Sequence, residues 1–219
     1  MAKPARTIAP RIDRILLPDL DPADAAVLVS GADLEGVRVA GGDLSERDLT
    51  GIRLREVEVV GVTAHDVHLR GADIAETVLD RWDAPVLRAP RASLRDVVVS
   101  NSRIGSVEFY EDTWQAVHFV GCKLGFVNLR GATLRDVRFT DCTVDELDLG
   151  GARVERMAFT DSDVRSLDVT SARLADVDLR GLDLDVTGVE GLRGATMDEL
   201  QVALIATRLA EQLGIRIVG

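Results

Sequence analysis

The sequence has few of the residues that stabilise small secreted domains and ordinary compact cores. It contains only 2 cysteines among 219 residues, which excludes a disulfide framework and a cysteine-rich zinc module. Aromatic residues make up only 4 % of the chain, although Phe, Tyr and Trp supply much of the burial in most cores of this size. This low aromatic content indicates an unusually narrow interior.

Long hydrophobic runs are absent as well. Residues 1–6 lack the apolar core of a signal peptide, and no stretch of about 18 apolar residues occurs anywhere in the chain. We therefore expect a cytoplasmic protein that does not enter a membrane.

Positive charge is scarce. The chain has 37 acidic and 26 basic residues, giving a formal net charge of −11, which has the wrong sign for binding DNA or anionic membranes. An acidic protein can instead compete with a nucleic acid for a basic surface. With 46 % hydrophobic and 29 % charged residues, the chain is too apolar to be disordered.

The feature that dominates the sequence is an internal repeat. Every fifth residue from Leu34 to Val189 is apolar, and no insertion shifts this frame. A period of five matches neither an α-helix, at 3.6 residues per turn, nor a strand, at 2. It requires a chain that turns a corner every five residues and points the central residue of each pentad inward. The residue two positions earlier is a second inward candidate.

A longer period, of four pentads, lies above the first one. The second inward position at 32, 52, 72, 92, 112, 132, 152 and 172 is alanine in six of eight cases, the exceptions being Ile52 and Asp112. Four pentads therefore form one four-sided coil. Coils that stack at the strand spacing of about 4.8 Å bury their inward residues in a continuous column. We predict an all-β solenoid of about eight coils over residues 27–194.

The pentads resemble the A-(D/N)-L-x-x motif of the pentapeptide-repeat family. The clearest examples are GADLE at 31–35, GADIA at 71–75 and GATLR at 131–135. The resemblance implies a right-handed quadrilateral β-helix; the handedness comes from the family and not from the spacing.

The two open ends of such a solenoid need caps. We assign residues 1–26 to an N-terminal extension and cap, with the first seven residues disordered. Within residues 10–30, several apolar side chains lie outside the repeat frame. We expect them to form this cap, and they are Ile12, Ile15, Leu16, Leu17 and Leu20.

Residues 195–219 are expected to form a C-terminal helix and a short final strand at 215–218. Thr196 and Glu199 have capping-box spacing, and Gly214 is a typical helix stop. The helix carries two apolar stripes, of which one contains Met197, Leu200 and Leu204. In the gyrase-interacting members of the family this region forms a two-fold dimer. The resemblance thus implies a homodimer interface at Val202, Ile205, Leu209 and Leu213. The alternative is a purely intramolecular cap.

The middle of the repeat contains an irregular stretch. Trp82, Ala84 and Ala89 interchange large and small residues, and Pro85 and Pro90 stand in the wall. The stretch forms either a recognition notch or a compensated packing defect. One coil later, Asp112 occupies the alanine column, where an unpaired carboxylate is costly, so we expect it to turn outward or to find hydrogen-bond donors.

The sequence favours no enzyme. The histidines His65, His68 and His118 lack metal-site spacing, and no phosphate loop or nucleophile motif is present. Cys122 and Cys142, at the same position of successive coils, are expected to be small core thiols in a reducing compartment. We therefore expect no catalytic residue, no metal and no cofactor.

The acidic residues gather toward the C-terminus. Residues 141–190 contain 13 acids and 5 bases, a net charge of −8. The stacking predicts a partner-binding acidic patch made of Asp145, Glu146, Asp148, Asp163, Asp168, Asp183 and Asp185.

Two functions are compatible with this surface. The resemblance to the loop-free, quinolone-protecting type of pentapeptide-repeat protein implies an acidic DNA mimic that binds a type II topoisomerase such as DNA gyrase. The alternative is a generic protein-binding scaffold with an unrelated partner, using the region of Trp82 and Trp114. Ordinary solubility would also explain a charged outer wall.

Overall fold

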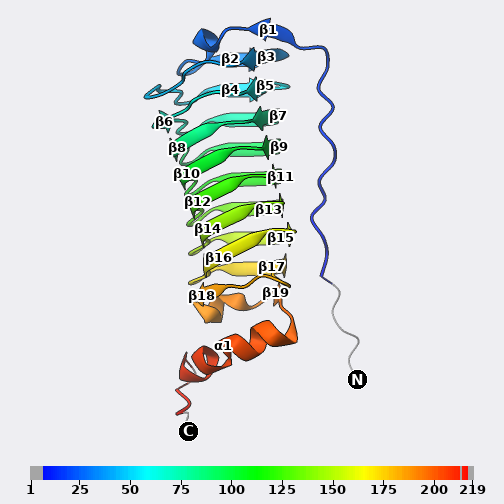
Figure 1. Ribbon diagram of the computed structural model, residues 1–219, viewed down its shortest axis with the longest axis vertical. Helices are drawn as coiled ribbons and strands as arrows, with labels where there is room; N and C mark the ends of the chain where they lie inside the picture. The colour runs from blue at the N-terminus through cyan, green and yellow to red at the C-terminus, as the bar shows by residue number, and fades with distance from the viewer. Residues whose placement is uncertain (1–6, 213, 217–219) are drawn as a thin grey trace.

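The computed structural model describes residues 7–212 and 214–216, and it shows a rod of stacked coils (Figure 1). Each coil contributes strands to two parallel sheets. The first sheet contains β1 (Asp21–Ala23), β2 (Asp33–Glu35), β3 (Val37–Ala40), β4 (Arg53–Arg55), β5 (Glu58–Val60), β7 (Asp73–Asp80), β9 (Ser93–Ser100), β11 (Thr113–Val120), β13 (Thr133–Thr140), β15 (Arg153–Thr160), β17 (Arg173–Asp178) and β19 (Ala195–Thr196).

The second sheet contains β6 (Val67–His68), β8 (Asp83–Arg88), β10 (Arg103–Glu108), β12 (Lys123–Asn128), β14 (Thr143–Asp148), β16 (Asp163–Asp168) and β18 (Asp185–Thr187). Three helical segments complete the described fold: η1 (Ala25–Val27), η2 (Val189–Leu192) and α1 (Glu199–Gln212).

The strands pair in parallel, and from β2 to β17 each paired residue has as its partner the residue 20 positions further along the chain. Trp114 pairs with Leu134, and Phe119 pairs with Phe139. These two pairs lie on neighbouring sides of the same two coils. Each coil is therefore hydrogen-bonded to the coils on both sides of it. The predicted all-β solenoid, a quadrilateral β-helix of four-pentad coils with a C-terminal helix, is confirmed.

The core is a column of inward side chains. The central residues Phe119 and Phe139 are fully buried, and their rings stack with centroids 5.0 Å apart. Phe139 and Phe159 stack in the same way at 5.1 Å. Ala132 and Ala152 are fully buried in the alanine column, where a narrow interior leaves no space for larger side chains.

The corners of the coil have a special backbone conformation. At most corners the residue two positions after the central residue adopts positive φ, with Gly131 at 67° as an example. L-residues also hold this conformation at many corners, among them Ala116 at 55° and Arg156 at 60°. The left-handed region costs an L-residue on the order of 1 kcal/mol, so the stacking of each coil must offset this strain.

The repeat frame breaks in the last coil. Leu167 of β16 pairs with Val186 of β18, so the register is one residue shorter than in the coils before it. Leu184, expected at a central inward position, is therefore only half-buried, whereas Val186 is buried. The prediction of an unbroken frame to Val189 is wrong here. Segment η2 follows directly, and its Gly191 lies so close to the Val169 carbonyl that no side chain would fit there.

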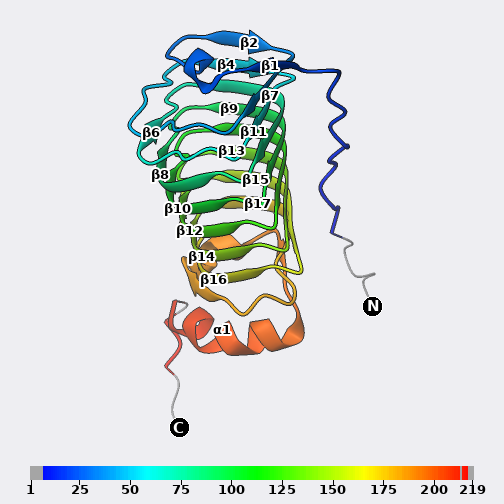
Figure 2. The same cartoon turned by 45° about the horizontal axis from the view of Figure 1, so that its top comes forward.

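At the N-terminal end, only residues 21–28 of the predicted cap cover the first coil. Strand β1 pairs with β3, and Asp24 caps η1 by accepting a 2.7 Å hydrogen bond from the amide of Ala26. Residues 7–20 run instead down the outside of the rod (Figure 2). The prediction that Ile12, Ile15, Leu16, Leu17 and Leu20 cap the end is therefore wrong. Of the first seven residues, predicted to be disordered, residues 1–6 lie outside the described residues, and the prediction is wrong for Thr7, whose hydroxyl contacts that of Thr196.

At the other end, helix α1 begins later than its sequence suggests. The capping box pairs Asp198 with Gln201, whose amide donates to Asp198 Oδ1 at 2.9 Å. Thr196 belongs to β19, so the predicted box with Glu199 is wrong. Gly214 ends the helix with φ 73°, and the amide of Ile215 donates to Ala210 O, as predicted for a helix stop. Ile215 and Arg216 form no strand, and residues 217–218 lie outside the described residues.

Gln201 attaches α1 to the solenoid. Its side-chain oxygen accepts from the amide of Asp198 at 2.9 Å. Its side-chain nitrogen donates to the carbonyls of Leu179 and Leu182 at 2.6 and 2.7 Å. The residue is buried, and it supplies the donors that these two carbonyls lack at the open end of the coil stack.

We predict that Gln201→Met, which keeps the side-chain volume, lowers the free energy of unfolding by about 1–3 kcal/mol, because buried carbonyls lose their donors. The measurement is urea denaturation followed by circular dichroism. Glu199→Gln, an exposed change in the same helical turn, serves as the control and should leave the midpoint unchanged. Equal midpoints for both variants would contradict the assigned role of Gln201.

Candidate functional site

The seven residues of the predicted acidic patch lie on the C-terminal coils, on two neighbouring sides of the rod and the corner between them. Asp148 of β14 pairs in register with Asp168 of β16, so these two carboxylates stack on one side. On the adjacent side, Asp163 of β16 stacks on Thr143 of β14, and Asp183 and Asp185 follow in the next coil. The structure thus brings the predicted residues together along the axis.

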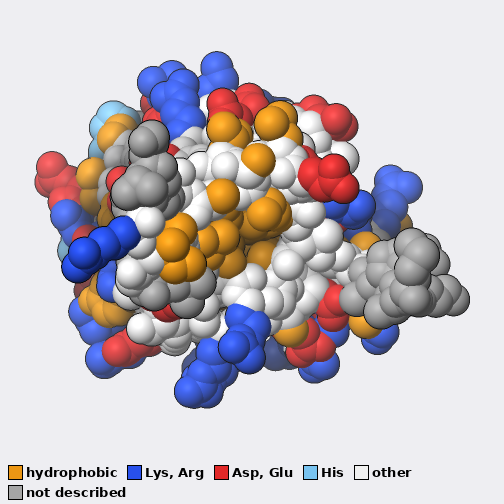
Figure 3. All heavy atoms as spheres, turned by 90° about the horizontal axis from the view of Figure 1, so that it is seen from below, with side chains coloured by type: hydrophobic (Ala, Val, Ile, Leu, Met, Phe, Trp, Pro, Cys, Tyr) orange, Lys and Arg blue, Asp and Glu red, His pale blue; other side chains and the backbone are white. Residues whose placement is uncertain are grey.

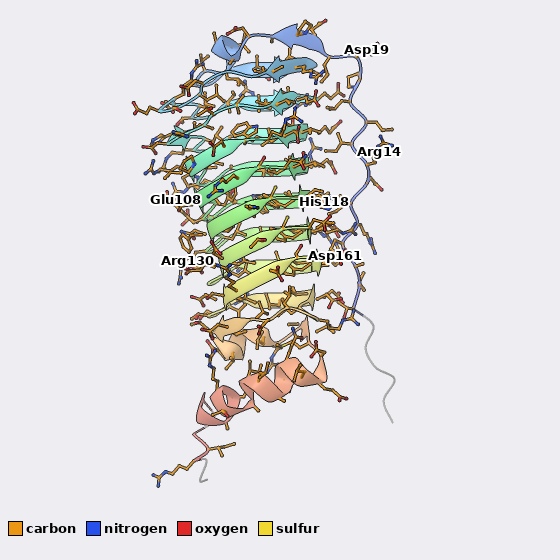
Figure 4. The ribbon with its side chains drawn as sticks, viewed as in Figure 1. Arg14, Asp19, Glu108, His118, Arg130 and Asp161 are labelled. Atoms are coloured by element: carbon orange, nitrogen blue, oxygen red, sulfur yellow. The ribbon has the colours of Figure 1, made fainter. Side chains whose placement is uncertain are left out.

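Arginine side chains pair with four of the seven acids. Arg165 binds Asp145 at 2.7 Å, and Arg208 of α1 binds Asp185. Arg130 contacts Asp148 at 2.7 Å and Asp168 at 3.6 Å. Figure 4 shows Arg130 on the side of the rod opposite Asp161. The patch is therefore less negative than the residue count suggests.

Three acids of the patch keep an uncompensated charge. Glu146, Asp163 and Asp183 are exposed, and within the described residues none has a cationic partner within 4.0 Å. The four-pentad period predicts part of this pattern, since Arg165 stands directly over Asp145 in the coil stack. The contribution of Arg208 could not be predicted, because it depends on how α1 docks.

The residues of the predicted dimer interface lie in different environments. Ile205, 6 % exposed, and Leu209 pack against the end of their own solenoid, so they serve the cap in the single chain. Val202 is exposed, and the side chain of Leu213 lies outside the described residues. Of the other predicted stripe, Leu200 and Leu204 are exposed by 71 % and 68 %, whereas Met197 packs against the core. Figure 3 shows hydrophobic side chains gathered on this end of the rod.

The tryptophans are core residues. Trp82 and Trp114 are both buried, and the Trp82 indole donates to Val59 O at 3.2 Å. An apolar cavity of about 30 Å³, lined among others by Trp82 and Ala89, lies in the core at this level. The Trp82 and Trp114 side chains therefore belong to the core and are not themselves a recognition surface.

Asp112 is buried in the alanine column and accepts hydrogen bonds there. Of the two alternatives expected from the sequence, turning outward or finding donors, the second is confirmed. It accepts from the amide of Ala92 at 2.9 Å and from the Trp114 indole at 3.1 Å. Burial outweighs these bonds and raises the pKa of the Asp112 carboxyl to about 8. The folded protein therefore holds a proton there in neutral solution.

The remaining candidate residues are the histidines and the cysteines. His65 and His68 are exposed, while His118 is half-buried beside the Thr140 hydroxyl at 2.9 Å. Cys122 and Cys142 are buried and free, as predicted. Among the residues that the structure describes, no group of three or more His, Cys, Asp or Glu side chains could hold a metal ion. No described helix has the length and hydropathy needed to span a membrane.

Sequence reasoning missed one polar cluster. Asp136 and Arg156, on successive corners of the first sheet, form a buried bidentate ion pair with distances of 2.6 and 2.8 Å. The amide of Arg11 donates to the same Asp136 carboxylate at 2.8 Å. The equivalent positions of Asp136 and Arg156 in successive coils could have suggested the pair. Its burial could not be predicted, because residues 7–20 cover it.

The fold and the site define a parallel β-solenoid protein with a charged outer wall. Residues 112–188 match the family model of the pentapeptide repeat region. Residues 112–188 are therefore a pentapeptide-repeat region, as the motifs predict. No curated protein matches the sequence.

Solved structures were also matched, at low sequence identity. A trypsin-treated variant of QnrB1, a plasmid-mediated fluoroquinolone resistance protein, is 17 % identical with a TM-score of 0.41; the match covers 91 % of this chain and 100 % of that one. Full-length QnrB1 is 18 % identical with a TM-score of 0.35, covering 86 % and 94 %. HetL, a pentapeptide-repeat protein involved in heterocyst differentiation regulation from the cyanobacterium Nostoc sp. strain PCC 7120, is 18 % identical with a TM-score of 0.29, covering 76 % and 90 %.

We predict that stability falls with rising pH because of Asp112. Its folded-state pKa lies near 8, above its usual value of 3.8, so the unfolded chain releases a proton that the folded protein keeps. The free energy of unfolding should therefore fall as the pH rises between these two values. Burial lowers the pKa of His118, which gives the opposite slope below about pH 6.5.

The measurement is urea denaturation from pH 6.5 to 8.5 of the wild-type chain and of Asp112→Ala, which restores the commonest residue of this column. The difference between the two chains isolates the carboxyl from other titrating groups. The wild-type midpoint should fall more steeply with pH than that of the variant. Parallel curves would contradict the buried, protonated state.

Proposed function

We propose that this chain is a non-enzymatic interaction protein that mimics DNA and binds the basic DNA-binding surface of a type II topoisomerase, DNA gyrase. The observation that carries the proposal is the uncompensated charge of Glu146, Asp163 and Asp183 on consecutive levels of a rod. The motif resemblance to gyrase-interacting pentapeptide-repeat proteins supports the same partner.

The charge density supports mimicry. Residues 141–190 span about two and a half coils, which is roughly 12 Å of axis at about 4.8 Å per coil. Their net charge is −8, from 13 acids and 5 bases. It becomes −6 when Arg130 and Arg208, which pair with acids of this stretch, are included. One negative charge per about 2 Å is comparable with B-DNA, which carries one per about 1.7 Å.

The exposed stripe of α1 supplies the proposed homodimer contact. A second copy seated on Leu200 and Leu204 would bury the apolar patch of Figure 3 and bring two acidic ends together. Ile205 and Leu209 would continue to cap their own solenoid. The joined rod would carry its negative charge in the middle, so a two-fold symmetric partner could bind both halves.

The alternative function is a protein-binding scaffold with a different partner. It is favoured by the ion pairs at Asp145, Asp148, Asp168 and Asp185, which remove part of the negative charge from the surface. The two functions differ in their dependence on acidic residues.

We predict salt-sensitive inhibition of gyrase supercoiling by the wild-type protein. Neutralising the three uncompensated acids with Glu146→Gln, Asp163→Asn and Asp183→Asn should weaken inhibition on the order of tenfold or more. The matched control carries Glu35→Gln, Glu46→Gln and Asp73→Asn, which changes the net charge equally at exposed positions on the N-terminal coils. The control should inhibit like the wild type.

A well-folded wild-type protein that fails to inhibit at low salt would exclude gyrase as the partner. Equal loss of inhibition in both triple variants would show that only the net charge matters, and would contradict a localised acidic site.

For the dimer, we predict that Leu200→Glu with Leu204→Glu converts the protein to a monomer, because the substitutions place like charges in an apolar contact. Sedimentation velocity measures the change. Ala206→Glu, an exposed change on α1 that lies well away from the Leu200–Leu204 stripe at about 100° per residue, is the control. A wild-type protein that is monomeric at 100 µM, roughly the upper end of useful concentrations, would exclude this interface.

A further inference from the structure

One side of the rod carries both signs of charge, separated along its length. This side, here called the polarised side, is formed by the first residues of β8, β10, β12, β14 and β16 in the second sheet (Figure 1). The outward residue before each central position changes from basic to acidic along the row, which reads Arg103, Lys123, Thr143, Asp163 and Asp183. The uncompensated acids of the C-terminal coils therefore have basic counterparts on the same side.

The two bases of this row keep their positive charge. Arg103 and Lys123 are exposed, and neither takes part in an ion pair within the described part of the chain. They pair with each other in register, so two like charges stand in adjacent coils, which is unfavourable. Asp83, the residue before Arg103 in the row, has its carboxylate 4.0 Å from His65. Carboxylates that approach from another molecule would relieve this repulsion.

A hollow of about 320 Å³ lies beside the two bases, and Asp145 is the acid of its lining. Gly105 and Gly125 also line it. A Cβ on Gly125 would lie 2.0 Å from the Gly105 carbonyl oxygen, so no side chain fits there. In the next two coils the same row carries exposed Asp145 and Arg165, which bind each other at 2.7 Å. The basic half of the polarised side is thus recessed, and the acidic half is raised.

The two halves match each other across a two-fold axis at the level of Thr143. Lys123 and Asp163 lie one coil from Thr143, on opposite sides of it. Arg103 and Asp183 lie in the second coil on either side. A second copy turned by half about an axis that crosses the rod at this level places its acids opposite the bases of the first. Both rows rise by about 4.8 Å per coil, so the charges stay in step over about 19 Å.

The shapes of the two halves follow the same symmetry. The half-turn sets Gly125 opposite Arg165 of the second copy, so the raised Asp145–Arg165 ion pair lies against the hollow. Because the charges of this ion pair cancel, its approach does not repel Lys123. Every contact forms twice, since a two-fold interface uses the same patch on both copies.

We propose that the polarised side is a self-complementary docking surface for a second copy of this chain, which lies antiparallel and side by side with the first. This lateral pair is distinct from the end-to-end contact through Leu200 and Leu204. It covers Asp163 and Asp183, so self-association and the binding of a basic partner at these acids exclude each other. The pairing itself does not depend on the identity of that partner.

Charge and area limit the strength of the lateral pair. Three exposed acids on the corners beside the polarised side have no basic counterpart across the axis, and they are Asp141, Glu146 and Asp161. A side of about five coils also buries less than the roughly 1,200 Å² of a stable interface. We therefore expect a dissociation constant on the order of 100 µM at low salt. About 0.5 M salt should dissociate the pair, because it screens exposed charges within a few ångströms.

The test uses full-length chains that all carry Leu200→Ser with Leu204→Ser, which removes the proposed end-to-end contact without adding charge. This parent is compared with a base-reversed chain, which adds Arg103→Glu and Lys123→Glu, and with an acid-reversed chain, which adds Asp163→Lys and Asp183→Lys. Sedimentation equilibrium measures association, and circular dichroism checks that each chain is folded.

The matched control adds Arg153→Glu and Arg173→Glu to the parent. These two exposed bases also pair in register in adjacent coils, but they lie on the first sheet. The control therefore changes the net charge as much as the base-reversed chain does, away from the polarised side.

The base-reversed and the acid-reversed chain should each associate about tenfold or more weakly than the parent, because like charges then meet across the axis. An equimolar mixture of the two should associate nearly as tightly as the parent, since every contact again joins opposite charges. Both chains remain net negative, so mixing them adds no general attraction. The control should associate like the parent.

A folded parent that stays monomeric at about 1 mM and low salt would overturn the proposal. So would a mixture that associates no more tightly than either reversed chain alone, or a control that weakens as much as the base-reversed chain. If a reversed chain does not fold, Lys123→Gln in the parent should still weaken association and Arg153→Gln should not. Equal affinities for these two variants would contradict the proposed surface.

Discussion

The structure depends on one constraint, which is that each coil must hydrogen-bond to the coils on either side in a fixed four-pentad register. A single coil can bury neither its central residues nor its backbone groups, so stability comes from the contacts between neighbours. This constraint explains why apolar residues recur every fifth position. It also explains why corners such as Ala116 and Arg156 tolerate positive φ, since the coils on both sides hold them in place.

The same constraint makes the two ends the most specialised parts of the chain. At the first coil, β1 and η1 cover the column, and at the last coil the chain shortens by one residue and passes into η2. Gln201 then supplies donors to Leu179 and Leu182, and Leu209 packs against the apolar column. A helix can perform this task because one face satisfies the coil while Leu200 and Leu204 on another face stay exposed.

Most of the solenoid could be predicted from the sequence, and parts of the candidate site could not. The stacking of Asp148 on Asp168 follows directly from the period, as does the placement of Arg165 over Asp145. The pairing of Asp185 with Arg208 depends on the docking of α1, and the burial of Asp136 depends on residues 7–20, in which Arg11 lies 125 residues away in sequence. A repeat specifies contacts between equivalent positions. The contacts of Asp185 with Arg208 and of Asp136 with Arg11 join positions that are not equivalent.

The amino-acid sequence alone determined the four-sided coil, its inward columns and the concentration of acid near the C-terminus, because a strict period acts at every level of the stack. The tertiary structure decided where the segments outside the repeat lie: residues 7–20 against Asp136 and Asp176, and α1 with Ile205 and Leu209 packed inward and Leu200 and Leu204 exposed. These segments have no period to fix their neighbours. Their positions are set by which backbone groups and apolar surfaces the finished solenoid leaves unsatisfied.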